Sequence, residues 1–530
     1  MIHHQVRTLS IIWAICMLAA SAWSQTVRIE TGLIEGVQNG AITVYKSIPF
    51  AAPPVGELRW RAPLPPLSWN GVRQADKFGP ICVQSGASVP GAAAEPVSED
   101  CLTLSIWTPA KSREQKLPVM VWIPGGGFTQ ESASMPLYWG DALATRGVIV
   151  VTINYRVGLL GFLAHPELTR ESTHHSSSNY GLLDQIAALG WIKRNVAAFG
   201  GDPGCVTIWG QSAGSMSVNL LVASPLGHGM FQRAIGESGA FFVPPAVTGS
   251  PDSWFLAGAE HEGVKLATAL GASSVEGLRK LEPEKFLKDG NPGTTHPIID
   301  GYVLPEEIYA AFAAGRQNDV PILIGSNADE GRPMIMGRDI KRASFAQDIG
   351  GAFGSNAVRD VAEDYLRVYP AATDREARDS RASFERDMRF GWDMWTWARM
   401  QAKTGRAGVF YYYFAHVPPY PAGSPFADWG AAHWSEVRYA FDHLSQEPWE
   451  WTDADHALAN TMAAYWTNFA RTGDPNGGGL PVWPNFTAKT ERLLHFEGTA
   501  TVGGVPNLEG LRLLDERLAS FRAPDPALLK

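Results

Sequence analysis

Residues 206–214 read Val-Thr-Ile-Trp-Gly-Gln-Ser-Ala-Gly, and they decide the fold prediction. The first four residues are apolar or β-branched, which predicts a buried strand. The last five match the pattern G-x-S-x-G, which is a weak signal alone because chance would supply about 0.3 such matches in a chain of this composition. Residues 215–223 are compatible with a helix, so the serine falls in a strand–turn–helix setting. A sharp turn of this kind needs small neighbours, and it would lift the Ser212 hydroxyl above the edge of a sheet.

Segments on both sides of this stretch alternate between strand and helix patterns. Continuous β-branched or apolar runs at 117–123, 148–153, 321–325 and 409–414 are typical of buried parallel strands. An apolar stripe that begins at Leu182 and a second one over 453–471 predict amphipathic helices. The alternation predicts an α/β fold with a central, mostly parallel sheet flanked by helices, and with long loop and helical insertions. No linker divides the chain, so we expect one domain over 25–530.

Composition narrows the function classes. The chain has 530 residues, of which 45% are hydrophobic and 18% charged, and this excludes a disordered chain. Its 54 glycines and 37 prolines are scattered without a period, which excludes collagen. The net charge of −9 gives no reason to expect a nucleic-acid partner.

The first 24 residues resemble a secretory signal peptide. A weakly basic start is followed by an apolar run over 9–22, which is too short to span a bilayer. Small residues at Ala22 and Ser24 favour cleavage before Gln25. We therefore expect a secreted or periplasmic protein without a membrane span in its mature form. An uncleaved anchor is the alternative.

Three cysteines remain after this cleavage. In an oxidising compartment a disulfide is allowed, and Cys82 with Cys101 would close a short local loop. That pairing leaves Cys205, which precedes an apolar run and is expected to be a buried free thiol. The few, widely spaced cysteines carry no zinc signature.

A glycine-rich loop follows the expected strand 117–123. Gly125, Gly126 and Gly127 precede Phe128, and their backbone N–H groups could approach an oxyanion closely. A flexible turn is the alternative. A phosphate-binding loop is disfavoured because no Gly-Lys-Ser/Thr follows.

Many ordered motifs resemble the type B carboxylesterase/lipase family of α/β-hydrolases, which includes cholinesterases and bacterial para-nitrobenzyl esterases. The para-nitrobenzyl-esterase type is the most similar in appearance. The resemblance covers about residues 27–490, and its motifs lie at 48–51, 98–102, 154–163, 181–185, 199–214 and 465–476.

The resemblance implies a role for each matching residue. Ser212 would be the nucleophile, His433 the base and Glu330 the acid that orients the base. The oxyanion-hole donors would be the N–H groups of Gly126, Gly127 and Ala213.

Further matches concern the surroundings of these residues. Ser238 resembles a serine that supports the Glu–His pair. The family's first disulfide corresponds to Cys82–Cys101, and its structural ion pairs correspond to Arg59–Glu99 and Arg156–Asp184.

Three departures from the family pattern bear on the substrate. Gln211 stands where many members have Glu, which weakens the case for a cationic ester. Pro124 stands where many members have His or Tyr, and Trp434 follows the base where Gly is usual. The bulky ring of Trp434 should narrow the pocket or stack on a flat substrate group.

Seven tryptophans fall within residues 392–451, and core packing is the simplest reading for most of them. Trp429 and Trp434, together with Phe128, are the candidates for the substrate pocket.

The resemblance implies a serine carboxylesterase that works through an acyl-enzyme and needs neither metal nor cofactor. Its partner would be a small-molecule ester, with aromatic, short-chain and polycarboxylate esters left open. A lipase is one alternative, and a non-catalytic cholinesterase-like binding or adhesion protein is another.

Overall fold

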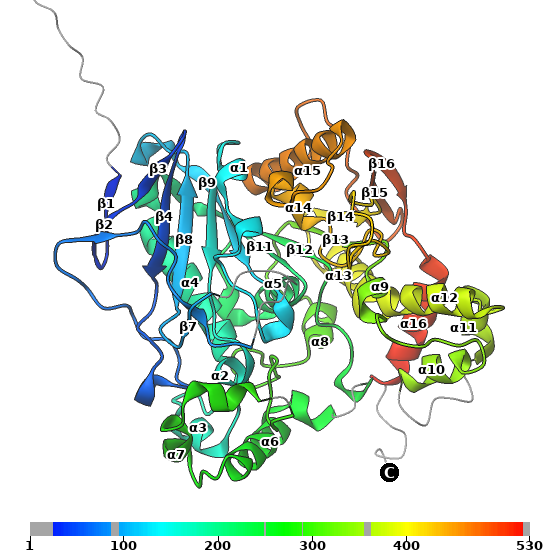
Figure 1. Cartoon of the computed structure of the whole chain (residues 1–530), viewed down its shortest axis with the longest axis horizontal. Coiled ribbons are helices and arrows are strands. Elements are labelled where there is room, and N and C mark those ends of the chain that lie inside the picture. Colours follow the sequence, from blue (N-terminus) through cyan, green and yellow to red (C-terminus); the bar gives the residue numbers. More distant parts are fainter. Residues whose placement is uncertain (1–24, 86–94, 248–250, 289, 354–361, 523–530) are drawn as a thin grey trace, which may run out of the picture.

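A twisted sheet of 11 strands forms the centre of the computed structural model (Figure 1). The structure describes residues 25–85, 95–247, 251–288, 290–353 and 362–522, so the expected signal peptide at 1–24 lies outside the described residues. In spatial order the strands are β16 (Thr499–Gly504), β15 (Arg492–Glu497), β14 (Val409–Phe414), β13 (Ile322–Asn327), β12 (Arg233–Glu237), β11 (Gly201–Gln211), β9 (Leu117–Ile123), β10 (Ile149–Ile153), β8 (Thr103–Thr108), β4 (Ile42–Pro49) and β3 (Val37–Asn39).

The middle of the sheet is parallel. Seven neighbouring strands pair in parallel with one another: β10, β9, β11, β12, β13, β14 and β15. At the two ends of the sheet the pairing is antiparallel, through β16 at one end and through β8, β4 and β3 at the other. Both faces of the central strands are buried, which explains their continuous apolar sequence. The predicted α/β class and mostly parallel sheet are confirmed.

Three strands begin at residues other than those expected, and one of them, β10, begins at Ile149 rather than at residue 148. Strand β13 begins at Ile322 rather than at Pro321, because proline has no N–H to donate to a neighbouring strand. Strand β11 begins at Gly201, and its pairing with β9 shifts register between Gly201 and Val206.

The helices α4 (Tyr180–Asn195), α5 (Ala213–Ala223) and α15 (Asp453–Thr472) match the expected positions. Helix α15 starts where Thr452 and Asp455 cap each other's backbone N–H groups. Strand β11 ends at Gln211 and helix α5 starts at Ala213, so Ser212 is the only residue between them.

Long insertions separate the later strands. Between β13 and β14 lie α9 (Gly331–Met334), α10 (Phe345–Gly351), α11 (Ala362–Val368), α12 (Asp374–Arg386), a π-helical turn (Asp387–Gly391) and α13 (Trp392–Thr404). Helices α10, α11 and α12 gather with α16 (Leu508–Ser520) at the side of the molecule away from β1 (Thr26–Ile29) and β2 (Gly32–Glu35) (Figure 1).

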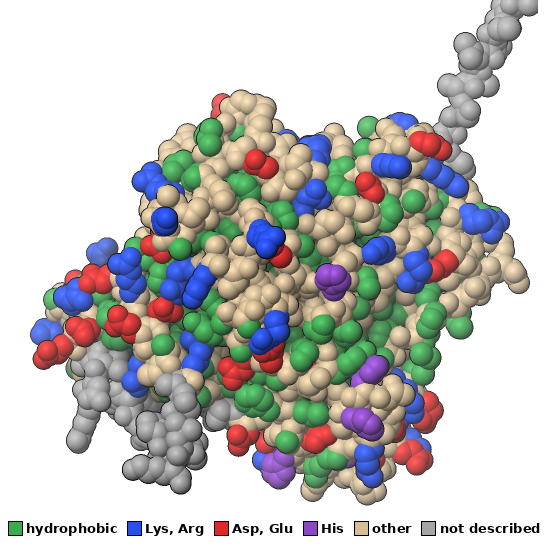
Figure 2. Space-filling view, turned by 180° about the vertical axis from the view of Figure 1, so that it is seen from behind, with side chains coloured by type: hydrophobic (Ala, Val, Ile, Leu, Met, Phe, Trp, Pro, Cys, Tyr) green, Lys and Arg blue, Asp and Glu red, His purple; other side chains and the backbone are tan. Residues whose placement is uncertain are grey.

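Large aromatic side chains are buried in the core, and many charged side chains lie on the surface. Trp392, Trp395 and Trp397 on α13 are buried in the core, as the simplest reading of the tryptophan-rich segment expected. On the face shown in Figure 2, acidic and basic side chains lie among one another. Within the part of the chain that the structure describes, no helix has the length and apolarity needed to cross a membrane.

Candidate active site

Ser212 occupies the turn between β11 and α5. Its backbone has φ 56° and ψ −125°, an unfavourable conformation for a residue with a side chain. The Ser212 N–H donates to the Glu237 carbonyl oxygen over 2.8 Å, which helps to hold the turn. A Cβ added to Gly214 would lie 2.0 Å from the Ile123 carbonyl oxygen, and one added to Gly210 would lie 2.5 Å from the Gly214 backbone. Both glycines are therefore required by the close approach of the backbone.

His433 and Glu330 meet although 103 positions separate them. Glu330 Oε2 lies 2.5 Å from His433 Nδ1, and Glu330 Oε1 accepts the Asn327 N–H over 2.7 Å. The Glu330 side chain is fully buried. A carboxylate held on both oxygens can fix the orientation and tautomer of an imidazole.

The neighbouring Asp329 points elsewhere. Its carboxylate pairs with Arg332 Nε over 2.7 Å and accepts the Ala431 N–H over 2.9 Å. In an extended segment neighbouring side chains point to opposite sides, but Glu330 has the helical angles φ −46° and ψ −37°. A turn at the start of α9, not strand alternation, separates the two carboxylates.

The environment of His433 favours the protonated form of the imidazole. Burial alone would lower the pKa of His433, but the charge of Glu330 and its hydrogen bond raise that pKa above the ordinary 6.5. Phe390 stacks on the ring with 4.4 Å between centroids and 21° between planes. Sequence reasoning missed Phe390, which carries no motif.

Gln211 also lies against the imidazole. Its amide nitrogen is 3.4 Å from His433 Nδ1 and 3.3 Å from Nε2. Among the described residues, the hydrogen-bond partners of the ring are Glu330 and Gln211, while Ser212 and His433 line the same cavity. In serine hydrolases the hydrogen bond between the serine hydroxyl and the imidazole commonly tightens only when substrate is bound.

The expected oxyanion-hole residues line the same cavity as Ser212. Gly126 and Gly127 have φ 74° and 61° and open a short 3₁₀ turn, while Ala213 is the first residue of α5. N–H groups at the start of a helical segment have no acceptor within that segment, so they can bind an anion. All three residues line the cavity.

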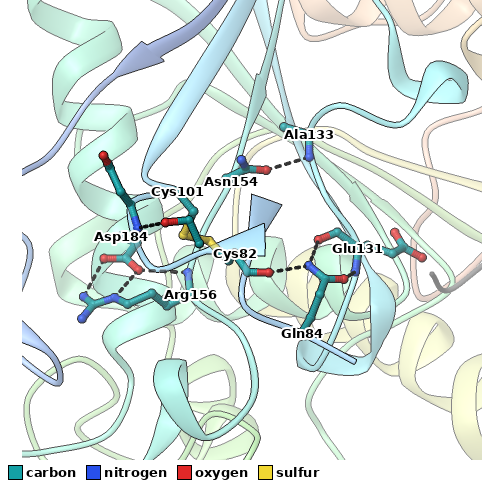
Figure 3. Close-up of a disulfide and its surroundings, with 10 residues drawn as sticks. Cys82, Gln84, Cys101, Glu131, Ala133, Asn154, Arg156 and Asp184 are labelled. Carbon is teal, nitrogen blue, oxygen red and sulfur yellow. Dashed lines mark hydrogen bonds and ion pairs between the residues drawn. A yellow bond between two sulfur atoms is a disulfide. The ribbon is translucent and has the colours of Figure 1, made fainter. Parts of the chain in front are cut away.

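Glu131 and Gln84 brace this glycine loop, and neither residue was predicted. Glu131 Oε2 accepts the Gly125 N–H over 3.1 Å and the Tyr138 hydroxyl over 2.7 Å. Gln84 donates to the Glu131 carbonyl oxygen over 3.0 Å and accepts the Glu131 N–H over 2.7 Å (Figure 3). No local pattern predicts the contact between Gln84 and Glu131, because 47 positions separate the two residues.

The disulfide Cys82–Cys101 joins this arrangement. Gln84 Nε2 also donates to the Cys82 carbonyl oxygen over 3.0 Å (Figure 3). Hydrogen bonds through Gln84 and Glu131 thus link the disulfide to the N–H of Gly125 in the glycine loop. The ion pair Arg156–Asp184 lies close to the disulfide, with 2.7 Å between its nitrogen and oxygen atoms. In the second expected ion pair, Arg59–Glu99, this distance is 2.6 Å.

Cys205 corrects an expectation. It is half-buried rather than buried, and its sulfur lies 3.2 Å from Arg233 Nη1 and 3.5 Å from the Ala470 carbonyl oxygen. The reason is its position in β11, one residue before the strand enters the core at Val206.

Ser238 lies beside a different carboxylate from the one expected. Its hydroxyl is 3.5 Å from Glu436 Oε1, and Asn327 Nδ2 donates to Glu436 Oε2. Burial and the charge of Glu330 raise the pKa of Glu436 to about 7. Ser238 thus contacts a second buried carboxylate rather than the Glu330–His433 pair itself.

A cavity of about 950 Å³ opens above Ser212. Trp429 and Trp434 line it, as expected, and Gln211 lines it as well, but Phe128 does not. Phe128 is buried and packs edge-to-face on Phe162 with 5.4 Å between centroids, so its ring belongs to the core.

Trp434 is held on two sides. Its indole N–H donates to the Tyr138 hydroxyl over 3.1 Å, and the Arg438 guanidinium lies 4.7 Å from the ring centroid. Its backbone φ of 79° is the left-handed conformation that favours glycine, the residue usual at this position in the resembled family.

No cluster of three or more His, Cys, Asp or Glu side chains in the described ranges could hold a metal ion. The groups next to Ser212 are the His433 imidazole, which has the buried Glu330 carboxylate behind it, and backbone N–H donors.

Comparison with known proteins agrees with this geometry. The model of the carboxylesterase family matches residues 23–510. The para-nitrobenzyl esterase of Bacillus subtilis (strain 168) is 35% identical in an alignment of 503 positions that covers 92% of this chain and 97% of that protein. The fumonisin B1 esterase of Sphingopyxis macrogoltabida is 37% identical in an alignment of 476 positions that covers 87% of this chain and 84% of that protein.

A solved structure of a PNB esterase superposes with a TM-score of 0.79 at 31% identity and covers 92% of this chain and 99% of its own. This fold match also bears out the expected α/β-hydrolase fold. On the strength of the family model and these relatives, the chain belongs to the carboxylesterase family and is a carboxylic ester hydrolase.

Proposed function

We propose that Ser212, His433 and Glu330 form the catalytic triad of this carboxylesterase. The observation that carries the proposal is the buried contact between Glu330 and His433, whose imidazole faces the same cavity as Ser212. The chain order Ser, Glu, His is the order found in α/β-hydrolases.

The reaction follows from the roles of these groups. His433 Nε2 takes the proton of the Ser212 hydroxyl, whose oxygen attacks the ester carbonyl carbon. The N–H groups of Gly126, Gly127 and Ala213 stabilise the negative oxygen of the tetrahedral intermediate. The imidazolium then gives its proton to the leaving alcohol, and an acyl-enzyme remains. Water, deprotonated by the same imidazole, releases the carboxylic acid and restores Ser212.

Covalent labelling tests the nucleophile. A fluorophosphonate should label the wild-type chain at the peptide that carries Ser212, and Ser212→Ala should abolish both labelling and ester turnover while the fold persists. The matched control is Ser445→Ala, an exposed serine outside the cavity, which should still be labelled. Hydrolysis by Ser212→Ala within tenfold of the wild type would contradict the proposal. A wild-type chain without labelling or turnover would favour a binding protein instead.

We also propose that the chain is exported and cleaved before Gln25. The apolar run over 9–22 supports this proposal, and so does the disulfide, which persists in oxidising compartments. Intact mass measurement of the exported protein should give a chain that starts at Gln25. A mass that includes Met1 would contradict cleavage.

A further inference from the structure

Three arginines line the cavity above Ser212, and they share one carboxylate. Glu385 lies 3.1 Å from Arg338, 2.6 Å from Arg381 and 2.6 Å from Arg389, measured between oxygen and nitrogen atoms. One negative charge therefore faces three positive charges at this part of the wall. Sequence reasoning did not select any of these residues.

Among the residues that the structure describes, two other acidic side chains line the cavity, and they do not balance this positive charge. Glu131 is engaged with the Gly125 N–H and the Tyr138 hydroxyl, beside the glycine loop. Asp393 accepts the Phe242 N–H over 3.1 Å, and burial raises its pKa to about 7, so it carries only part of a charge near neutral pH. The wall around Glu385 keeps a net positive charge.

Two of the arginines keep donors for a ligand. Within the described part of the chain, the Arg389 guanidinium contacts a protein acceptor only through Nε, and Arg338 only through Nη1. Their side chains are 57% and 42% exposed. Arg381, by contrast, is buried and also donates to the Asp348 carbonyl oxygen, so it anchors the cluster.

This cluster is joined directly to the catalytic histidine. Arg389 belongs to the π-helical turn Asp387–Gly391, and the next residue, Phe390, stacks on His433. Such π-helical turns occur frequently at functional sites. An anion bound by Arg389 would thus share one cavity with the ester that Ser212 attacks.

We propose that the preferred substrates are esters that carry a second, free carboxylate, which Arg389 and Arg338 bind. This inference rests on the proposed function and names its substrate class. A guanidinium matches a carboxylate in geometry, because it offers parallel N–H donors, and charge-assisted bonds of this kind are stronger than neutral ones. The existing bonds to Glu385 orient both guanidinium groups before the ligand arrives.

The test compares esters that differ only in the charged group. Monoethyl esters of linear dicarboxylic acids are compared with the same molecules in which the free acid is a carboxamide. A second series places the acid or amide on the alcohol side of an acetate ester. In at least one series, the wild-type kcat/KM for the acid should exceed that for the matching amide by about tenfold or more, mainly because the acid has a lower KM. Added salt should reduce this preference.

Variants then assign the preference to the cluster. Arg389→Gln should reduce the acid-to-amide ratio of kcat/KM about tenfold, and Arg389→Lys should retain part of it, because the charge remains but the paired donors are lost. The matched control is Arg375→Gln, an exposed arginine on α12, the helix that carries Arg381 and Glu385. Arg375 does not line the cavity, so this variant should leave the ratio unchanged.

The outcomes separate this inference from the proposed function. An acid-to-amide ratio near one in both series, with amide esters still hydrolysed in a Ser212-dependent way, would overturn the carboxylate site alone. An unchanged ratio in Arg389→Gln would overturn it as well. If no ester were hydrolysed, the proposed function would fail, and this inference with it.

Discussion

Glu330 Oε2 and His433 Nδ1 lie 2.5 Å apart, and the side chain of Glu330 is completely buried. The contact joins the start of α9 to a loop after β14, and an isolated bridge between Asp329 and Ala432 runs beside it. The backbone thus aligns the two segments, and the side chains complete the contact.

Glu330, not Asp329, should be the acid that activity requires. Glu330→Gln should preserve the fold yet lower kcat by about 10⁴, a magnitude taken from an amide replacement in a serine-protease triad, because an amide cannot stabilise the imidazolium. Asp329→Asn is the matched control and should cost far less, since Asp329 contacts Arg332 and the Ala431 N–H. Measuring kcat of both variants on one activated ester decides the assignment, and the reverse ranking would assign the role to Asp329.

The pH dependence of activity should reflect the raised pKa of His433. The base must be neutral to accept the Ser212 proton, so kcat/KM should rise as pH increases through that pKa, with half of the maximum reached above 6.5. Removing the negative charge in Glu330→Gln should move the titration to lower pH. An NMR titration of the imidazole in Ser212→Ala, with and without Glu330→Gln, measures this directly. An equal pKa in the two proteins would contradict the coupling.

Glu436 should make the stability of the protein depend on pH. Its pKa is about 7 in the fold and 4.5 as the ordinary value, so the folded state keeps its proton to higher pH than the unfolded state does. The stability contributed by this group is fully present below about pH 4.5 and is lost as pH rises through about 7, by an amount of at most about 3 kcal/mol.

Glu436→Gln cannot ionise and should therefore gain stability over the wild type as pH rises from about 5 to about 8.5. Thermal unfolding at the two pH values measures the gain. Glu450→Gln, at an exposed position, is the control and should show no such trend. A difference between the wild type and Glu436→Gln that stays constant with pH would refute the assignment.

Trp434 should determine which esters fit the cavity. Trp434→Gly should open the wall beside His433, and its left-handed backbone suits glycine, so the chain should still fold. We expect the ranking of bulky against small esters to change by 1–3 kcal/mol, roughly tenfold or more in relative kcat/KM. Trp434→Phe keeps a ring but loses the bond to Tyr138, and it should change the ranking less. An unchanged ranking across an ester panel would remove Trp434 from substrate selection.

The sequence by itself determined the local pieces of this protein. Residues 206–214 predicted a strand and a turn, and residues 215–223 predicted the helix that follows. The turn requires Gly210 and Gly214, because glycine is the only residue type that permits so close an approach of the backbone. The ranges 117–123 and 409–414 matched strands β9 and β14, because runs of apolar residues in parallel sheets are buried on both faces. The candidate triad came from motifs whose residue types and order are retained in the chain.

The tertiary structure alone decided which distant side chains meet. Ser238 contacts Glu436 instead of Glu330, Phe128 turns into the core, and Gln84 reaches Glu131 across 47 positions. The arginines around Glu385 acquire significance only because α12 and its π-helical turn are packed beside His433. Local sequence sets backbone propensity and periodicity, whereas these contacts depend on how separate elements pack, and no short stretch of residues carries that information.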